Sequence, residues 1–165
     1  MLVLMCGTSF SGKSTFARAL AAEIQATTIS LDEINERRGL WGGDGIALEE
    51  WQRTHEIATV EVRSQLSAGR TVVIDDTSSP RFLRDGWRSV AAQAGVGFAL
   101  IYLDVDQATI RRRQADNRIS QRRRDVADAV LEEHLASFEP PEPDEAAVRV
   151  SSVDDLDQVL KYLTI

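Results

Sequence analysis

Cysteine, lysine and long apolar runs are all scarce in this chain of 165 residues. The single cysteine, Cys6, has no partner for an internal disulfide, which favours a reducing compartment. No apolar run reaches the roughly 18 residues that a membrane-spanning helix needs, and the first residues lack the basic and apolar regions of a secretory signal. We therefore expect a cytoplasmic protein without a membrane partner.

An excess of positive charge is also missing, because 19 lysines and arginines face 26 aspartates and glutamates, for a net charge of −7. Such a balance disfavours a surface that binds nucleic acid over its whole extent. Lysine occurs only as Lys13 and Lys161, whereas seven arginines and one acid lie between Arg111 and Arg124. This local concentration of arginine predicts an anionic ligand nearby, although a solvated helix face would have the same composition.

Short apolar runs alternate with amphipathic segments along the chain. The runs that predict strands are residues 2–6, 27–30, 71–75, 98–103 and 148–150. Helical spacing of apolar residues is found at 16–24, 31–38, 47–68, 80–94, from 107 into the arginine-rich segment, and at 126–138 and 153–163. The alternation predicts an α/β fold with a parallel sheet flanked by helices, in a single domain over residues 1–165. The glycine-rich connection at 39–45 is expected to be mobile.

The strongest motif follows the first predicted strand and matches the phosphate-binding pattern G-x-x-x-x-G-K-S/T. It consists of Gly7, Thr8, Ser9, Phe10, Ser11, Gly12, Lys13 and Ser14, with Thr15 next in the helix. The glycines let backbone N–H groups converge on phosphate oxygens, and the following helix adds its positive end. We expect Lys13 to contact the β- and γ-phosphates and Ser14 to bind Mg²⁺. A glycine turn followed by a surface lysine is the alternative.

Acidic residues follow two further predicted strands. Asp75 ends the third strand, where a carboxylate can hold Mg²⁺ beside the phosphate loop, or can simply cap a turn. Asp32 is expected at the end of the second strand, facing the γ-phosphate, where it would take a proton from an acceptor hydroxyl. Its alternative is an N-cap of the next helix. Asp76 is expected to serve the acceptor site or the local structure.

The arginine-rich segment predicts a lid over residues 111–126. The planar guanidinium group binds the oxygens of a transferring phosphoryl group, and a lid excludes water. Arg113 is the candidate for nucleotide binding and Arg118 the candidate for catalysis. The run from Arg122 to Arg124 either assists them or is solvated.

Other residues carry weaker signals. Arg81 and Arg84 follow the third strand and are secondary candidates for contact with an anionic acceptor. His134 lies on an apolar helix without ligand spacing and is expected to pack or to face solvent. Trp41 and Trp51 are expected in the core or in a pocket wall.

Together these pieces resemble small bacterial P-loop kinases of an AAA-type, ATP-binding family, in its zeta-toxin-like and polynucleotide-kinase-like branch. The matching pieces are residues 7–15, 30–32, 72–77, 111–124 and 138–141 together with Glu145. The resemblance implies a three-layer P-loop fold with a five-stranded sheet in the order 2-3-1-4-5, with ATP and Mg²⁺ as cofactors. It also implies that Asp32 is the base. Asp76 departs from the asparagine or small residue common at its position.

Three functions fit these observations. The first is transfer of the ATP γ-phosphate to a hydroxyl of a small molecule, whose pocket around residues 31–47 suggests a modest, partly aromatic acceptor. The second is a polynucleotide 5′-hydroxyl kinase, which the arginine-rich lid permits and the net charge of −7 disfavours. The third is an ATPase or nucleotide switch acting on a protein partner, supported only by the Asp75–Asp76 pair. The oligomeric state is not predicted.

Overall fold

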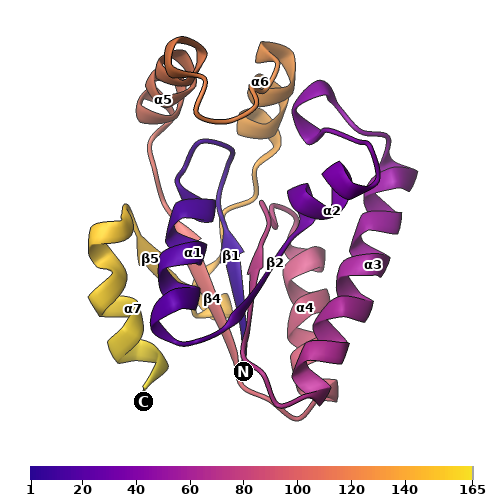
Figure 1. Cartoon of the computed structure of the whole chain (residues 1–165). Helices are drawn as coiled ribbons and strands as arrows, with labels where there is room; N and C mark the ends of the chain where they lie inside the picture. Colours follow the sequence, from indigo (N-terminus) through magenta and orange to yellow (C-terminus); the bar gives the residue numbers. More distant parts are fainter. Residues whose placement is uncertain (165) are drawn as a thin grey trace.

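A parallel five-stranded sheet in the order β2-β3-β1-β4-β5 lies at the centre of the computed structural model, which describes residues 1–164 (Figure 1). The strands are β1 (Leu2–Cys6), β2 (Thr27–Ser30), β3 (Val72–Asp75), β4 (Phe98–Leu103) and β5 (Val148–Val150). Every neighbouring pair runs parallel, with Leu2 of β1 opposite Val72 of β3 and Phe98 of β4. The α/β class and the strand order expected from the sequence are confirmed.

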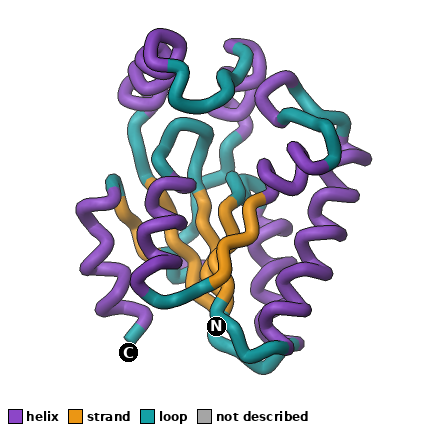
Figure 2. Tube along the Cα trace, in the orientation of Figure 1, coloured by secondary structure: helices purple, strands orange, loops and turns teal. Residues whose placement is uncertain are grey.

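Helices cover both faces of this sheet (Figure 2). They are α1 (Lys13–Glu23), α2 (Leu31–Arg37), α3 (Leu48–Ser67), α4 (Arg81–Gln93), α5 (Gln107–Ser120), α6 (Asp128–Ser137) and α7 (Leu156–Leu163). Three short 3-10 helices are η1 (Gly42–Asp44), η2 (Pro143–Glu145) and η3 (Val153–Asp155). Helices α1 and α7 pack on one face, and α2, α3 and α4 pack on the other. Within the described part of the chain, none of the helices combines the length and apolar character needed to cross a bilayer.

Strand β1 is apolar throughout because it is buried on both faces. Leu2, Leu4 and Cys6 enter the core formed with α3 and α4, whereas Val3 and Met5 enter the core formed with α1 and α7. A central parallel strand covered on both sides is expected to have this composition. Burial raises the pKa of the Cys6 thiol to about 12, so the thiol stays protonated and unreactive near neutral pH.

The carboxyl ends of the strands meet at one edge of the sheet, and the segment formed by α5 and α6 lies over that edge (Figure 1). Phe10, from the loop after β1, packs against Ile110 of α5 and Leu131 of α6. Open parallel sheets bind ligands beyond these carboxyl ends. The architecture therefore places a covered site between the β1–α1 loop and the α5–α6 segment.

A buried ion pair holds the proline-rich segment against α4. Arg84 donates from Nε and Nη2 to the Glu145 carboxylate, at 2.6 and 2.7 Å, and both side chains are 1% exposed. The Nη1 atom of Arg84 also donates to the carbonyl oxygens of Ser78 and Glu139, each at 3.0 Å. Arg81 pairs with carboxylates of the same proline-rich segment. The two arginines therefore fasten this segment, and neither lines the pocket at the carboxyl edge of the sheet.

Glu145→Gln is expected to lower the free energy of unfolding by about 3 kcal/mol, because it leaves the Arg84 charge buried without a counter-charge. Glu132→Gln breaks the exposed Arg111–Glu132 pair and should cost less than about 1 kcal/mol. Urea denaturation of both variants measures the difference. Equal losses would contradict a structural role for the buried pair.

Candidate active site

The loop between β1 and α1 forms a cradle for an anion. Gly12, with φ of 100°, is the N-cap of α1. Because glycine has no side chain, it cannot cap the helix with a hydrogen bond, and the first turn of α1 carries no acidic residue. A Cβ at Gly7 would lie 3.0 Å from both the Leu103 carbonyl oxygen and the Ser11 hydroxyl. The Ser11 hydroxyl is itself buried without a hydrogen-bond partner in the protein. Free amides at a helix N-terminus and an unsatisfied hydroxyl fit a phosphate group.

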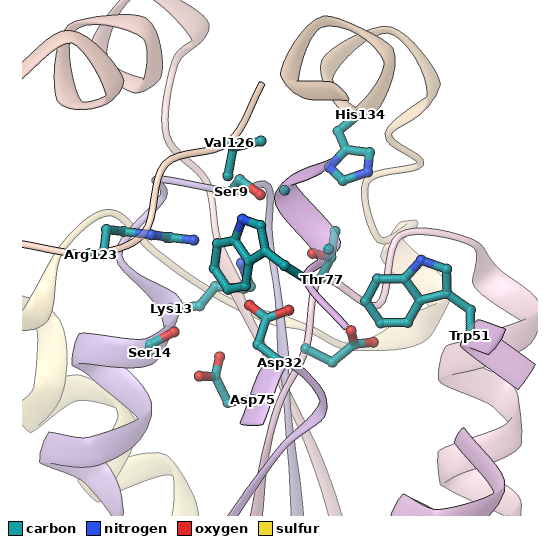
Figure 3. Close-up of a pocket in the computed structure, with 14 residues that line it drawn as sticks. Ser9, Lys13, Ser14, Asp32, Trp51, Asp75, Thr77, Arg123, Val126 and His134 are labelled. Carbon is teal, nitrogen blue, oxygen red and sulfur yellow. The ribbon is translucent and has the colours of Figure 1, made fainter. Parts of the chain in front are cut away.

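Lys13 lies inside this cradle. Its Nζ donates a hydrogen bond of 2.9 Å to the carbonyl oxygen of Thr8, and the residue is 8% exposed. Together with Ser9 and Ser14, it lines a pocket at the carboxyl edge of the sheet (Figure 3). Thr15 is exposed on α1 and lies outside the lining of this pocket. The buried ammonium is thus held where a phosphate chain would enter the loop.

Ser14 and Asp75 line the same pocket from neighbouring elements (Figure 3). A hydroxyl and a carboxylate are the oxygen ligands that Mg²⁺ takes, so this pair fits the metal. Among residues 1–164 there is no group of three or more histidine, cysteine or acidic side chains suited to a metal. A Mg²⁺ ion held by this pair would therefore need nucleotide phosphates as additional ligands.

Asp76 supports the turn that follows β3. One of its carboxylate oxygens accepts hydrogen bonds of 2.9 Å from both the N–H and the hydroxyl of Ser78, which has a positive φ of 47°. A short acidic side chain commonly stabilises such a turn in this way. Asp76 also reaches the pocket lining, so it combines a structural role with a place in the cavity wall.

Asp32 lies in the first turn of α2, and the expectation that it ends the second strand is wrong. The N-cap of α2 is Ser30, whose hydroxyl accepts from the N–H of Glu33, so Asp32 does not cap the helix. Asp32 as a whole is exposed, and its carboxylate opens into the pocket. The surrounding protein atoms still reduce its hydration, and this desolvation raises the pKa of Asp32, an effect that Lys13 opposes and the nearby carboxylates of Asp76 and Asp75 reinforce.

Two indoles and a histidine form the walls beside Asp32. Trp41 is the residue before η1. Trp51 comes from α3 and His134 from α6 (Figure 3). The Nδ1 atom of His134 is buried and has no hydrogen-bond partner in the protein. Burial lowers the pKa of His134, so the ring is neutral near pH 7. The sequence predicted packing or solvent exposure for His134, because its helical spacing does not show that α6 overhangs the pocket.

The structure separates the arginine candidates. Arg113 donates to the carbonyl oxygens of Phe10 and Ser11, at 3.1 and 2.7 Å, and so braces the phosphate loop. Arg118 is exposed and lies outside the pocket lining, where it pairs with two aspartates of its own segment. Arg123 lines the pocket instead and stacks over the Phe10 ring at 4.7 Å. No sequence signal distinguishes Arg123 from the arginines on either side of it.

The glycine-rich connection is joined to the loop between α5 and α6. The Trp41 indole Nε1 donates to the carbonyl oxygen of Asp125 at 2.8 Å, and the N–H of Ala127 donates to the carbonyl oxygen of Gly43 at 2.9 Å. Arg124 stacks on the Trp41 ring at 5.1 Å. These contacts close the pocket from above and bring residues 39–45 and 123–127 together.

Gly43→Ala is expected to break this closure. A Cβ at Gly43 would lie 2.6 Å from the Asp125 carbonyl oxygen and would overlap the Trp41 indole. We expect amide hydrogen exchange at Ala127 to accelerate by about tenfold or more, as loss of one net hydrogen bond implies.

The matched control is Gly86→Ala, because a Cβ there meets open space within α4. It should leave exchange at Ala127 unchanged and stabilise the helix by up to about 1 kcal/mol. Unchanged exchange at Ala127 in Gly43→Ala would show that the contact does not need glycine.

Solved structures of P-loop proteins match this fold along almost the whole chain. A sugar kinase from Janibacter sp. HTCC2649 is 23% identical, with 99% of this chain and 94% of that chain covered and a TM-score of 0.74. The APS kinase CysC of Mycobacterium tuberculosis, in complex with AMPPNP and APS, is 19% identical over 99% and 97%, with a TM-score of 0.72. Kti12 of Chaetomium thermophilum, in complex with ADP-AlF3, is 18% identical over 99% and 97%, with a TM-score of 0.76. At these identities, the likeness establishes the fold.

No curated protein matches the sequence as a relative. The sequence profile of one family, described as an AAA domain, does match, and it covers residues 2–141. The match includes the phosphate loop, Asp32, Asp75 and the α5–α6 segment. The chain therefore belongs to the AAA domain family and has its P-loop at residues 7–14.

Proposed function

We propose that this protein is an ATP- and Mg²⁺-dependent kinase that transfers the γ-phosphate to a hydroxyl group of a small molecule. The observation that carries this proposal is the position of Asp32, in the same pocket as Lys13 and beside the walls formed by Trp41 and Trp51. Hydrolysis of ATP needs no such aromatic walls beside the phosphate loop. The sugar kinase, gluconokinase and APS kinase structures that share the fold support an acceptor of small size.

The phosphate loop, residues 7–15, is the proposed site for the ATP phosphates, and Arg113 braces this loop from α5. The nucleotide analogues in the similar APS kinase and Kti12 structures support a nucleotide in this position. Ser14 and Asp75 would hold Mg²⁺, which when bound offsets charge on the phosphate oxygens. We assign residues 111–126 as the lid of a single domain over residues 1–165.

Asp32 is the proposed general base. It takes the proton of the acceptor hydroxyl as that oxygen bonds to the γ-phosphorus, and the bond from the γ-phosphorus to the bridging oxygen of ADP breaks. Lys13 and Arg123 would stabilise the negative charge of the transferring group. Arg118 would have to leave Asp125 and Asp128 to take this role, so Arg123 is the better candidate.

The two alternative functions have less support. To reach Asp32, the end of a polynucleotide would have to pass the contact between residues 39–45 and 123–127. The net charge of −7 also disfavours binding of a polyanion. An ATPase would use Asp76 to polarise water, yet one Asp76 oxygen is engaged by Ser78. The resemblance to the zeta-toxin-like and polynucleotide-kinase-like branch stays a prediction, because the family match is to the AAA domain as a whole.

Asp32→Asn is expected to slow γ-phosphate transfer by roughly 10²–10⁴, because the base is lost, while ATP binding changes little. A thermal-shift screen with Mg²⁺–ATP and a panel of sugars and nucleosides identifies an acceptor for the assay, since bound ligands raise the melting temperature. Glu33→Gln alters the neighbouring carboxylate, which lies outside this pocket, and should leave the rate within about twofold.

Three results would contradict this proposal. A Lys13→Ala variant that still transfers phosphate would exclude the P-loop mechanism. Acceptor-free ATP hydrolysis that Asp76→Asn abolishes and Asp32→Asn does not would favour the ATPase. Salt-sensitive labelling of 5′-hydroxyl oligonucleotides would favour the polynucleotide kinase.

The pH profile should report the base directly. The pKa of Asp32 is raised by burial, and the base must be deprotonated to accept a proton. As the pH is lowered, we therefore expect kcat/KM to begin to fall at a pH above about 4, the ordinary pKa of an aspartate. The residual rate of Asp32→Asn should lack this fall. A profile in which both proteins lose activity at the same pH would assign the titration to another group.

A further inference from the structure

We propose that the acceptor is an uncharged ring compound carrying several hydroxyl groups, and that His134 Nδ1 binds one of these groups. This inference rests on the proposed kinase function. The part of the pocket concerned, here named the acceptor compartment, is lined by Asp32, Trp41, Gly42, Trp51, Thr77 and His134. It lies beside the phosphate cradle and shares Asp32 with the proposed reaction.

The charges around the pocket argue against an anionic acceptor. Its only lysine or arginine residues among the described lining are Lys13 and Arg123. Lys13 lies within the phosphate loop, and Arg123 stacks on Phe10 of that loop, so we assign both to the triphosphate side. Their charges also reach Asp32. The acceptor compartment has the Asp32 carboxylate and no cation of its own. A phosphate, sulfate or carboxylate on the acceptor would therefore face repulsion without a compensating ion pair.

Other nearby arginines are already paired with carboxylates. Arg84 is buried against Glu145, and its guanidinium is further engaged by backbone carbonyls. Arg124 pairs with Asp44 at 3.3 Å and covers the outer face of the closing contact. To bind an anionic acceptor, these groups would have to break existing ion pairs.

The walls of the acceptor compartment suit a flat ring. Trp41 is 8% exposed, and Trp51 is partly buried and lines the same pocket. A Cβ at Gly42 would lie 3.3 Å from the Trp51 ring and 3.5 Å from the Asp32 carboxylate, so glycine keeps the space between them open. Indole surfaces bind the apolar faces of rings, and a few polar groups then set the orientation.

His134 supplies a buried polar group beside this space. Its ring lies on the α6 side of the pocket, whereas Asp32 lies on the sheet side (Figure 3). A buried polar atom without a partner is costly, and a hydroxyl of a bound ligand would satisfy Nδ1. Two contacts on opposite sides, at Asp32 and at His134, require an acceptor with more than one hydroxyl.

The test separates acceptors by charge without knowing their identity. A protein-free metabolite extract of bacterial cells is divided by ion exchange into neutral, cationic and anionic fractions. Each fraction is incubated with the full-length protein and ATP labelled at the γ-phosphate. Lys13→Ala serves as the blank. Glucose is compared with gluconate, and adenosine with its 5′-monophosphate, as defined pairs that distinguish sugars from nucleosides.

A labelled product from the neutral fraction alone, with the neutral member of a pair preferred by at least about tenfold, is the expected result. Product from the anionic or cationic fraction would overturn the inference and leave the kinase function standing. The absence of any product that depends on Lys13 would overturn both.

Variants of His134 test the second contact. With the accepted neutral compound, His134→Ala is expected to raise the acceptor KM by about tenfold while the KM for ATP changes by less than about twofold. His134→Asn places an amide near the position of Nδ1 and should recover much of the loss. Glu133→Gln, one residue away and exposed, is the matched control. Equal effects on both KM values, or no recovery in the asparagine variant, would assign His134 a merely structural role.

Discussion

The common direction of the five strands is the constraint on which the rest of this structure depends. Because β1, β2 and β3 run parallel, their carboxyl ends bring the phosphate loop, the start of α2 and Asp75 to one edge of the sheet. Each of these segments follows directly from its strand, so the buried sheet holds the ligand-binding groups at set positions. Reversal of any one strand would remove its polar residues from the site.

The closure of the pocket depends on a different contact, between residues far apart in the chain. Trp41 reaches Asp125 with its indole N–H and carries Arg124 on its ring, while Arg123 beside it enters the pocket. The Trp41 side chain thus belongs both to the pocket wall near Asp32 and to the contact that holds the loop between α5 and α6. In the proposed kinase, such an arrangement would link occupation of the wall to the position of Arg123 and would exclude water from the reacting groups.

The abundance of arginine has a largely structural explanation. Arg84 secures the proline-rich segment, Arg118 ties the loop between α5 and α6 to the start of α6, and Arg113 braces the phosphate loop. The planar guanidinium suits each task because it can bind a carboxylate with two parallel hydrogen bonds or contact several carbonyls at once. Among the described lining of the pocket, the basic residues that remain for a ligand are Lys13 and Arg123.

The strand order was implied only by the resemblance to small P-loop kinases. The sequence by itself determined the alternation of strands and helices, the phosphate loop at residues 7–14 and the placement of Asp75 at a strand end. These features depend on short-range patterns, such as an apolar run followed by glycines and a lysine, whose local structure does not depend on distant partners. Only the tertiary structure decided that Ser30 caps α2 in place of Asp32, that Arg123 rather than Arg118 lines the pocket, and that His134 overhangs it. Each of these outcomes depends on which side chains meet across long separations in the chain, and neighbouring arginines look alike until their partners are in place.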